Sequence, residues 1–499
     1  MRPTGRRAED KTQLDRVIRV LWVMLLVAVP FTSHPITAAV IGWSPVSPLS
    51  VLPLIALAVL WLPTYILRFR SLPKLSLPLL AFVVLVLISS LAATFLPIYP
   101  AFDQTLPKRE FRSLLTLAAG VAFYLVAATW PRSERRLGFS LRWLYVGAVI
   151  LMLYATFQIV TLPTAANPVP DSLIQLHSLF SIRDPLRSRI TGFAYEPSWL
   201  GNQLVILYIP LWLGSVITGY SVYSRKFGPL SLEFVLLMWS LVVLFFSFGR
   251  LAWLSFFLLV AVLLILGSGR IWGRLAGMFG ERRQRNEQGV RLLPRLATTA
   301  AGFVSLAVIV AGLVLAASIL DKRIADSLSA DLPGIFSGRH PWPYRLANEL
   351  KSAERLMYWV SGLRVFSLYP ILGVGLGNAG FLMASTMPAF GYQLPEIIRA
   401  VHLGAFGFPN PKSLWVRLLA ETGVVGFALF VSWLVLIGVA AARIVRERVG
   451  MIRAIGLAAL FALLAQVTEG FGMDTFGLPH LWLILGLLTA ATQVPSGQR

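Results

Sequence analysis

The sequence predicts an all-α polytopic membrane protein of about twelve transmembrane helices, because of its composition and its long apolar runs. Of its 499 residues, 57% are hydrophobic and only 13% are charged, whereas a soluble domain averages roughly a quarter charged residues. Many of the apolar runs reach the roughly 20 residues that a helix needs to cross a bilayer. A large polar segment interrupts them between the ninth and the tenth span, at residues 321–412.

The first predicted span follows a basic N-terminal segment with Arg2, Arg6 and Arg7. It is long and lacks a small-residue cleavage site, so we expect it to be retained rather than removed as a signal peptide. We expect one membrane domain, in which residues 1–320 hold helices one to nine, residues 321–412 form a large external loop and residues 413–499 hold the last three helices. The spans are predicted near residues 14–32, 49–67, 76–96, 113–130, 143–162, 197–219, 231–248, 251–267, 297–319, 413–441, 454–469 and 478–493.

The net charge is strongly positive, since 44 Lys and Arg residues stand against 22 Asp and Glu residues, a balance of +22. With the N-terminus inside, most of this excess falls on cytoplasmic segments, above all on residues 270–295. This distribution follows the positive-inside rule and predicts that both termini are cytoplasmic. It indicates a membrane surface as the partner of the basic residues, and we expect no nucleic-acid partner. The remaining external cations are not needed for topology, so they suggest an anion bound at the outer face.

The large external loop contains a segment with helical periodicity, residues 352–368, in which Leu356, Val360 and Leu363 belong to one apolar stripe. Such a helix could lie on the membrane or against the helix bundle. The following segment, Gly375-Leu-Gly377-Asn-Ala-Gly380, matches a dinucleotide-binding pattern but follows a helix rather than a strand. We therefore interpret it as a glycine turn.

Glu196 stands where an external loop meets the sixth span, directly before Pro197. A carboxylate there could cap the helix, but Arg183, Arg187 and Arg189 lie just upstream. A carboxylate among guanidinium groups could instead bind an anion and supply a general base.

Arg250 is a lone cation in a tight external turn between two apolar spans. A charge at the lipid boundary is costly unless it snorkels or pairs, so it is a candidate functional residue.

The tenth span begins with Lys412, Arg417 and Glu421. Arg417 and Glu421 are four residues apart on one helix face, which favours an ion pair. Lys412 and Arg417 are five apart, roughly 140° around a helix, so they need not face one place. Glu469 and Asp474 are further candidate ion-pair partners near the last external turn.

The histidines show no metal-ligand spacing and the chain has no cysteine, so we expect neither a metal nor another cofactor. His402 lies in the large external loop, where a histidine could act as a general base.

Three segments, in this order, resemble the O-antigen ligase and polymerase superfamily of bacterial inner membranes. They are Ser247-Phe-Gly-Arg250-Leu-Ala-Trp, residues 355–378 and residues 412–426, and the Glu196-Pro-Ser segment resembles one of the polymerase branch. The resemblance implies a helical fold like that of the lipid-carrier-dependent (GT-C-like) glycosyltransferases. It also implies metal-independent transfer of a glycan from undecaprenyl diphosphate at the outer face of the plasma membrane. Ligases of the family present a His entering the tenth span, where this chain has Lys412-Ser413, and this departure favours a polymerase.

The resemblance implies roles for particular residues, because bidentate guanidinium groups suit a diphosphate leaving group. Glu196 is the expected general base, Lys412 the electrostatic assistant, and His402 an alternative base. The expected diphosphate ligands are Arg187, Arg189, Arg250, Arg355 and Arg417, with Arg250 also counted as catalytic. The expected partners are the undecaprenyl-diphosphate-linked glycan, membrane lipids, a flippase and a chain-length regulator. The alternatives are a ligase that transfers the glycan to a lipid or protein acceptor and, from another class, a transporter or flippase of the lipid-linked oligosaccharide.

Overall fold

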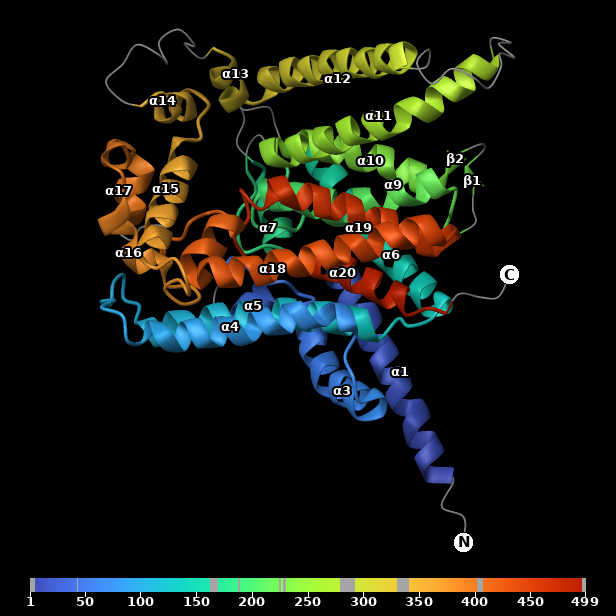
Figure 1. Ribbon diagram of the computed structural model, residues 1–499, viewed down its shortest axis with the longest axis horizontal. Helices are drawn as coiled ribbons and strands as arrows, with labels where there is room; N and C mark the ends of the chain where they lie inside the picture. Colours follow the sequence, from blue (N-terminus) through green and yellow to red (C-terminus); the bar gives the residue numbers. More distant parts are fainter. Residues whose placement is uncertain are drawn as a thin grey trace.

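The computed structural model describes residues 5–42, 44–161, 169–186, 189–223, 226–227, 230–278, 292–329, 341–401 and 407–495. The described regular structure is helical apart from two antiparallel two-residue strands, β1 (Lys226–Phe227) and β2 (Leu230–Ser231). Long helices form the body of the molecule, and the short helices of the large loop gather at one end of it (Figure 1). The strands and the C-terminus lie at the other end.

Eight described helical segments are long and apolar enough to cross a membrane, and three apolar helices are shorter. Together they cover every predicted span after the first, whereas α1 (Gly5–Ala28) is in neither group, so the count of twelve remains a prediction. The long ones are α3 (Val51–Phe69), α4 (Leu77–Ala93) with its leading turn η1 (Lys74–Ser76), α5 (Leu106–Thr129), α6 (Glu134–Thr161), the segment of α8 (Pro197–Gln203), η2 (Leu204–Tyr208) and α9 (Ile209–Thr218), α12 (Leu292–Leu320), α18 (Leu414–Glu447) and α19 (Gly450–Glu469). The shorter ones are α10 (Leu232–Ser247), the apolar part of α11 (Arg250–Met278) and α20 (Pro479–Thr492).

The start of α5 differs from the prediction. Thr105 and Pro107 open the helix at Leu106, since proline is favoured in the first helical turn, where its missing N–H is not needed. The charged residues Arg109 and Glu110, which precede the predicted span at 113–130, therefore lie in the first turns of this helix.

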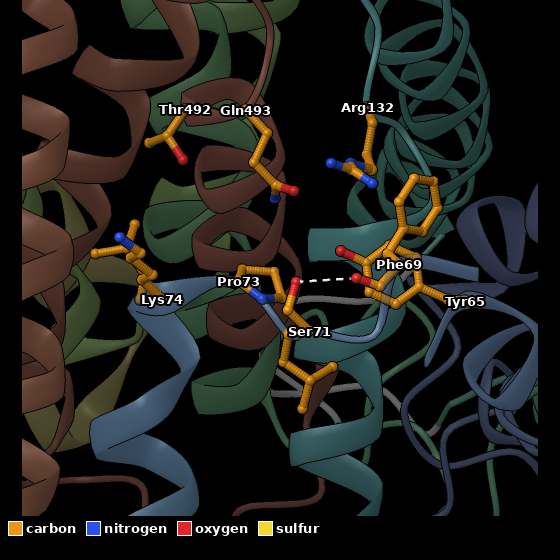
Figure 2. Close-up of a pocket in the computed structure, with 10 residues that line it drawn as sticks. Tyr65, Phe69, Ser71, Pro73, Lys74, Arg132, Thr492 and Gln493 are labelled. Atoms are coloured by element: carbon orange, nitrogen blue, oxygen red, sulfur yellow. Dashed lines mark hydrogen bonds between the residues drawn. The ribbon is translucent and has the colours of Figure 1, made fainter. Parts of the chain in front are cut away.

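The ends of α3, α4 and α20 that point away from the large loop surround a cavity (Figure 2). At the lower edge of Figure 1, α1 and α3 extend away from the other helices, and α11 and α12 run along the opposite edge. Only 6% of the apolar window of α12 is buried, although this helix packs against α11.

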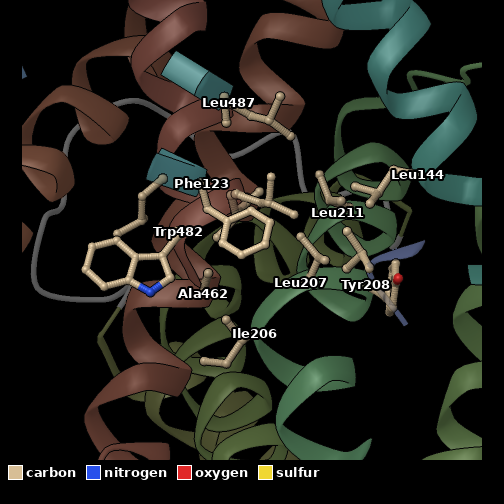
Figure 3. Close-up of a cluster of buried hydrophobic side chains, with 14 of the residues drawn as sticks. Phe123, Leu144, Ile206, Leu207, Tyr208, Leu211, Ala462, Trp482 and Leu487 are labelled. Atoms are coloured by element: carbon tan, nitrogen blue, oxygen red, sulfur yellow. The ribbon is translucent and has the colours of Figure 1, made fainter. Parts of the chain in front are cut away.

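The centre of the bundle is closely packed. Helix α20 packs on α5, and α19 packs on α9 and α18. Figure 3 shows the layer between them, where Phe123, Leu207 and Trp482 are fully or almost fully buried. Glycines permit this approach: a Cβ on Gly486 would stand 2.6 Å from the Cβ of Ala127. Larger side chains would separate the helices, as is usual at membrane helix interfaces built on small residues.

The large loop folds into short helices around its own small core of Met357, Met383, Phe390 and Ile397. Its elements are α13 (Lys322–Leu328), α14 (Trp342–Glu349), α15 (Ala353–Leu368), α16 (Ala379–Thr386), the turn η4 (Ala389–Gln393) and α17 (Pro395–Val401). Another short helix, α7 (Asp171–Ser178), precedes α8, and α2 (Pro35–Ile41) follows α1.

The predicted helix at residues 352–368 is present as α15, and it packs against α18 and α16. Leu363 of the predicted apolar stripe is 42% exposed, whereas Met357, Ser361 and Gly362 are buried. The physical reason is close packing: a Cβ on Gly362 would meet the side chain of Val416 at 2.6 Å, so small residues rather than large ones face α18.

Candidate functional site

Arg189 and Arg250 meet at the turn between α10 and α11. Arg189 donates hydrogen bonds from Nε to the carbonyl of Ser247 and from Nη2 to that of Phe248, both at 3.2 Å. Arg250 donates from Nη1 to the carbonyl of Leu350 at 2.6 Å and from Nη2 to that of Lys351 at 2.9 Å. Arg189 thus joins the turn to the segment that precedes α8. Arg250 joins the start of α11 to the end of α14 in the large loop. Both arginines are predicted diphosphate ligands.

Glu196 occupies the N-cap position of α8, but its side chain makes no capping hydrogen bond to that helix. One carboxylate oxygen instead accepts a hydrogen bond from Nη1 of Arg183 at 3.0 Å, and the other accepts one from the hydroxyl of Ser198 at 3.1 Å. The side chain remains 41% exposed. A carboxylate held in this way is oriented and remains accessible. Arg187, predicted beside it, lies outside the described residues.

A cluster of charged side chains surrounds Glu396 on α17, and we call it the Glu396 cluster. Burial raises the pKa of Glu396, and the carboxylates of Glu354 and Glu196 add to this rise. Lys412 and Arg355 lower the same pKa, so all four residues lie close enough to act on Glu396. The cluster therefore brings together three carboxyl groups and two cations from the large loop, α8 and the entry to α18.

Two further contacts fix the cations of this cluster. The Lys412 ammonium lies 5.9 Å from the centre of the Tyr358 ring, within reach of a cation–π interaction. Arg355 donates from Nη1 to the carbonyl of Gly472 at 3.2 Å, in the connection between α19 and α20. Of the predicted site residues, Glu196, Arg355 and Lys412 are thus brought together.

Beneath Arg355, a polar network is buried between the helices. The carboxylate of Glu469 accepts hydrogen bonds from the amide of Asn202 at 2.9 Å and from the hydroxyl of Ser255 at 3.2 Å. The other end of the Asn202 amide lies 3.4 Å from Nδ1 of His480. Arg355 is near enough to interact electrostatically with Glu469, so the network connects the Glu396 cluster to the interior of the bundle.

Arg417 belongs to a different group of residues. Its Nε donates to Glu421 at 2.8 Å and its Nη1 donates to the carbonyl of Asp474 at 2.6 Å. The predicted ion pair of Arg417 and Glu421 is therefore confirmed. The Arg417 guanidinium is almost fully buried, and it lies over the ring of Phe476 rather than beside Arg189 or Arg250.

Glu421 also holds the glycine turn. Its Oε2 accepts a hydrogen bond from the backbone N–H of Gly377 at 2.7 Å, and Arg109 donates to the carbonyl of the same glycine at 3.3 Å. Gly373, Gly375 and Gly377 all have positive φ, which favours glycine. The interpretation of this segment as a turn is consistent with that geometry.

Sequence reasoning missed Glu396, Asn202 and the role of Arg109. Arg109 lies just before the predicted span at 113–130, and Glu110 beside it accepts a hydrogen bond from Asn378 at 2.7 Å. No local pattern singles out Glu396, whose neighbours come from distant parts of the chain. Within the described ranges, no group of three or more metal-ligating side chains is positioned to hold a metal ion. His402 lies outside these ranges.

These observations define a helical membrane protein with a charged cluster at one end of its bundle, formed largely by a folded large loop. Residues 235–431 match the family model of the O-antigen ligase. The match confirms the resemblance to the O-antigen ligase and polymerase superfamily, a family that points to a glycosyltransferase-like enzyme acting on lipid-linked glycans. The matched range includes Arg250, Arg355, Glu396 and Lys412, whereas Glu196 precedes this range. No curated protein matches the chain.

Proposed function

We propose that this protein polymerises undecaprenyl-diphosphate-linked oligosaccharide units into a surface polysaccharide at the outer face of the bacterial plasma membrane. The family match supports a reaction on lipid-linked glycans. The observation that carries the proposal is the Glu396 cluster, in which carboxyl groups and cations converge beside the entry to α18. Glycan transfer from a diphosphate needs a carboxylate that accepts a proton and cations that stabilise the diphosphate.

In the proposed reaction, a hydroxyl of the acceptor glycan attacks the anomeric carbon of the donor sugar. A carbon–oxygen bond forms there as the bond to the phosphate oxygen breaks, and undecaprenyl diphosphate leaves with the electron pair. The hydroxyl proton passes to a carboxylate of the protein. Positive groups near the leaving oxygen stabilise the charge that develops on it, usually the largest contribution to such catalysis.

Glu196 remains the proposed general base, because its carboxylate is half-exposed and oriented by Arg183 and Ser198. Glu396 is a second candidate that the sequence did not suggest. Burial raises its pKa, and a carboxylate with a raised pKa is a stronger base when it is ionised. The two acids lie in one cluster, so one of them can orient the acceptor while the other takes its proton.

Arg355 and Lys412 are the proposed ligands of the diphosphate within the cluster. Arg189 and Arg250 hold backbone carbonyls of the neighbouring turn and of the large loop. We propose that they position the loop over the donor and that substrate binding redirects the exposed Arg250 toward phosphate oxygens. Arg417 holds the glycine turn through Glu421, and for it we propose a positioning role in place of the direct contact first expected. Arg187 and His402 stay proposed as a diphosphate ligand and an alternative base.

A ligase is the second candidate, because the matching family model is that of the O-antigen ligase. Lys412 and Ser413 stand where ligases of this superfamily present a histidine, and this favours a polymerase. A flippase would place its polar groups at the membrane midplane, whereas the Glu396 cluster lies at the entry to α18 and in the large loop. We propose a flippase and a chain-length regulator as partners that supply the donor and limit the product.

The test is a purified, membrane-reconstituted assay with one undecaprenyl-diphosphate-linked oligosaccharide, with products resolved by size. A ladder of lengthening lipid-linked chains supports the polymerase. Transfer only to an added lipid or protein acceptor supports the ligase instead. Movement of the intact lipid across the bilayer without any new glycosidic bond contradicts both.

A further inference from the structure

A cavity of about 330 Å³ lies far from the Glu396 cluster, at the opposite ends of the helices. Figure 2 shows the end of α3, the start of α4 and the end of α20 around it. Its volume is in the range of sites that bind small molecules or cofactors. The lining residues are Tyr65, Phe69, Ser71, Leu72, Pro73, Lys74, Leu75, Arg132, Thr492 and Gln493.

The charged groups in this lining are all positive. Lys74 and Arg132 reach the cavity from opposite sides, and the lining includes no carboxylate. Arg132 is held in place by the aromatic wall, since its guanidinium carbon lies 4.3 Å from the centre of the Phe69 ring and 5.5 Å from that of Tyr65. A guanidinium fixed in this way keeps its N–H groups free to point into the cavity.

Neutral polar groups complete the lining. The hydroxyls of Ser71 and Thr492 and the amide of Gln493 stand around the same space, as Figure 2 shows. Their protons are donated to the backbone carbonyls of Phe69, Thr489 and Ala128. Lys74 and Arg132 are therefore the donors that match the oxygens of a phosphate monoanion.

An apolar surface continues from the cavity along α3. Phe69 lines the cavity and is 39% exposed, and Ile66, next to it on the helix surface, is 47% exposed. On a helix that crosses a membrane, such side chains contact acyl chains. A molecule that carries both a phosphate and acyl chains fits this surface better than a soluble phosphate does.

We propose that this cavity binds the headgroup phosphate of an anionic phospholipid, with Lys74 and Arg132 as its ligands. Under the predicted topology it faces the cytoplasmic leaflet, where anionic lipids gather and basic pockets between helices recognise their headgroups. A lipid bound there contacts the end of α3, the start of α4 and the end of α20 at once.

The test titrates the purified full-length protein in non-ionic detergent with phosphatidylglycerol, phosphatidylcholine or inorganic phosphate and counts bound molecules by native mass spectrometry. The Lys74→Gln/Arg132→Gln variant is compared with Arg443→Gln/Arg446→Gln, which removes the same charge from two exposed arginines near the end of α18. We expect the cavity variant to bind phosphatidylglycerol about thirtyfold more weakly, and the control variant to bind as the wild type does. Wild-type protein should prefer phosphatidylglycerol to phosphatidylcholine.

Substitution of Arg132 also removes its ring contacts, so Lys74→Gln alone is the second variant, with a loss of about fivefold expected. Equal loss in the cavity and control variants would overturn the proposal, because it would indicate diffuse attraction. Equal binding of both lipids would overturn it as well. Displacement of the bound lipid by inorganic phosphate at comparable concentration would assign the cavity to a soluble phosphate compound and contradict the lipid.

Discussion

Replacement of Gly423 by alanine tests whether the break in α18 is required by the glycine turn. Gly423 has φ 64° and ψ −172° inside this helix, a conformation essentially confined to glycine. The break lets the N–H of Val424 donate to the carbonyl of Pro370 at 2.8 Å, and the carbonyl of Ala420 accept from Val374 at 3.1 Å. These hydrogen bonds with Pro370 and Val374 replace bonds that a continuous helix would make within itself.

Two effects add up in Gly423→Ala. The backbone conformation costs about 1–3 kcal/mol for a residue other than glycine. The added Cβ would also collide with the carbonyl group of Ile371 and stand 2.6 Å from the N of Leu372, and these are backbone atoms that cannot rotate away. Overpacking of this kind costs about 1–3 kcal/mol. We expect a total loss of about 2–6 kcal/mol.

The assay is the apparent melting temperature in detergent, followed by tryptophan fluorescence at a fixed heating rate. Gly438→Ala is the matched control in the same helix, because its Cβ would meet only the Leu463 side chain at 3.5 Å. Alanine there should be neutral or stabilising by about 0.5–1 kcal/mol. We expect the melting temperature to fall only in Gly423→Ala. Equal melting of both variants would refute the account of the break.

Three further predictions concern single side chains. Arg250→Ala should abolish glycan elongation without loss of membrane-inserted protein, whereas an unchanged chain-length distribution would exclude Arg250 from the site. Glu421→Gln should lower the stability by about 3 kcal/mol, because it leaves the buried Arg417 without its charged partner, and an unchanged melting temperature would contradict this. Burial lowers the pKa of His177 to about 4. Between this value and about 6.5, the unfolded chain therefore binds more protons than the folded chain. The free energy of unfolding falls as the pH drops through this window, by about 2 kcal/mol at pH 5. His177→Gln should flatten the melting temperature between pH 7.5 and pH 5, and an unchanged slope would disprove the assignment.

The helical architecture follows from hydropathy, because a membrane helix must satisfy its backbone internally and present an apolar surface. Predicted spans such as 413–441 and 454–469 therefore correspond to α18 and α19. Hydropathy does not predict the start of a helix where charged residues belong to its first turns, as Arg109 and Glu110 do in α5. Nor does it indicate which face of α15 is buried, since close packing on Gly362 outweighs side-chain size there.

The candidate site was only partly predictable. Glu196, Arg355 and Lys412 stood out as charges near span ends, and they meet around Glu396. Their meeting point depends on how α15 and α17 fold over the bundle, which no local pattern encodes. Arg417 was grouped with the other arginines by residue type, whereas its burial against Glu421 and Phe476 separates it from them.

The most direct test of the site compares Arg355→Gln with Arg364→Gln in the reconstituted elongation assay. Both arginines lie on α15 and donate a hydrogen bond to a backbone carbonyl, that of Gly472 at 3.2 Å and that of Thr386 at 3.1 Å. Only Arg355 belongs to the Glu396 cluster. We expect Arg355→Gln to lose about 10²–10³-fold in elongation rate, as when a donor to a developing negative charge is removed, and Arg364→Gln to keep the wild-type ladder of products. Equal ladders from both variants would contradict the assignment of the cluster as the site of glycan transfer.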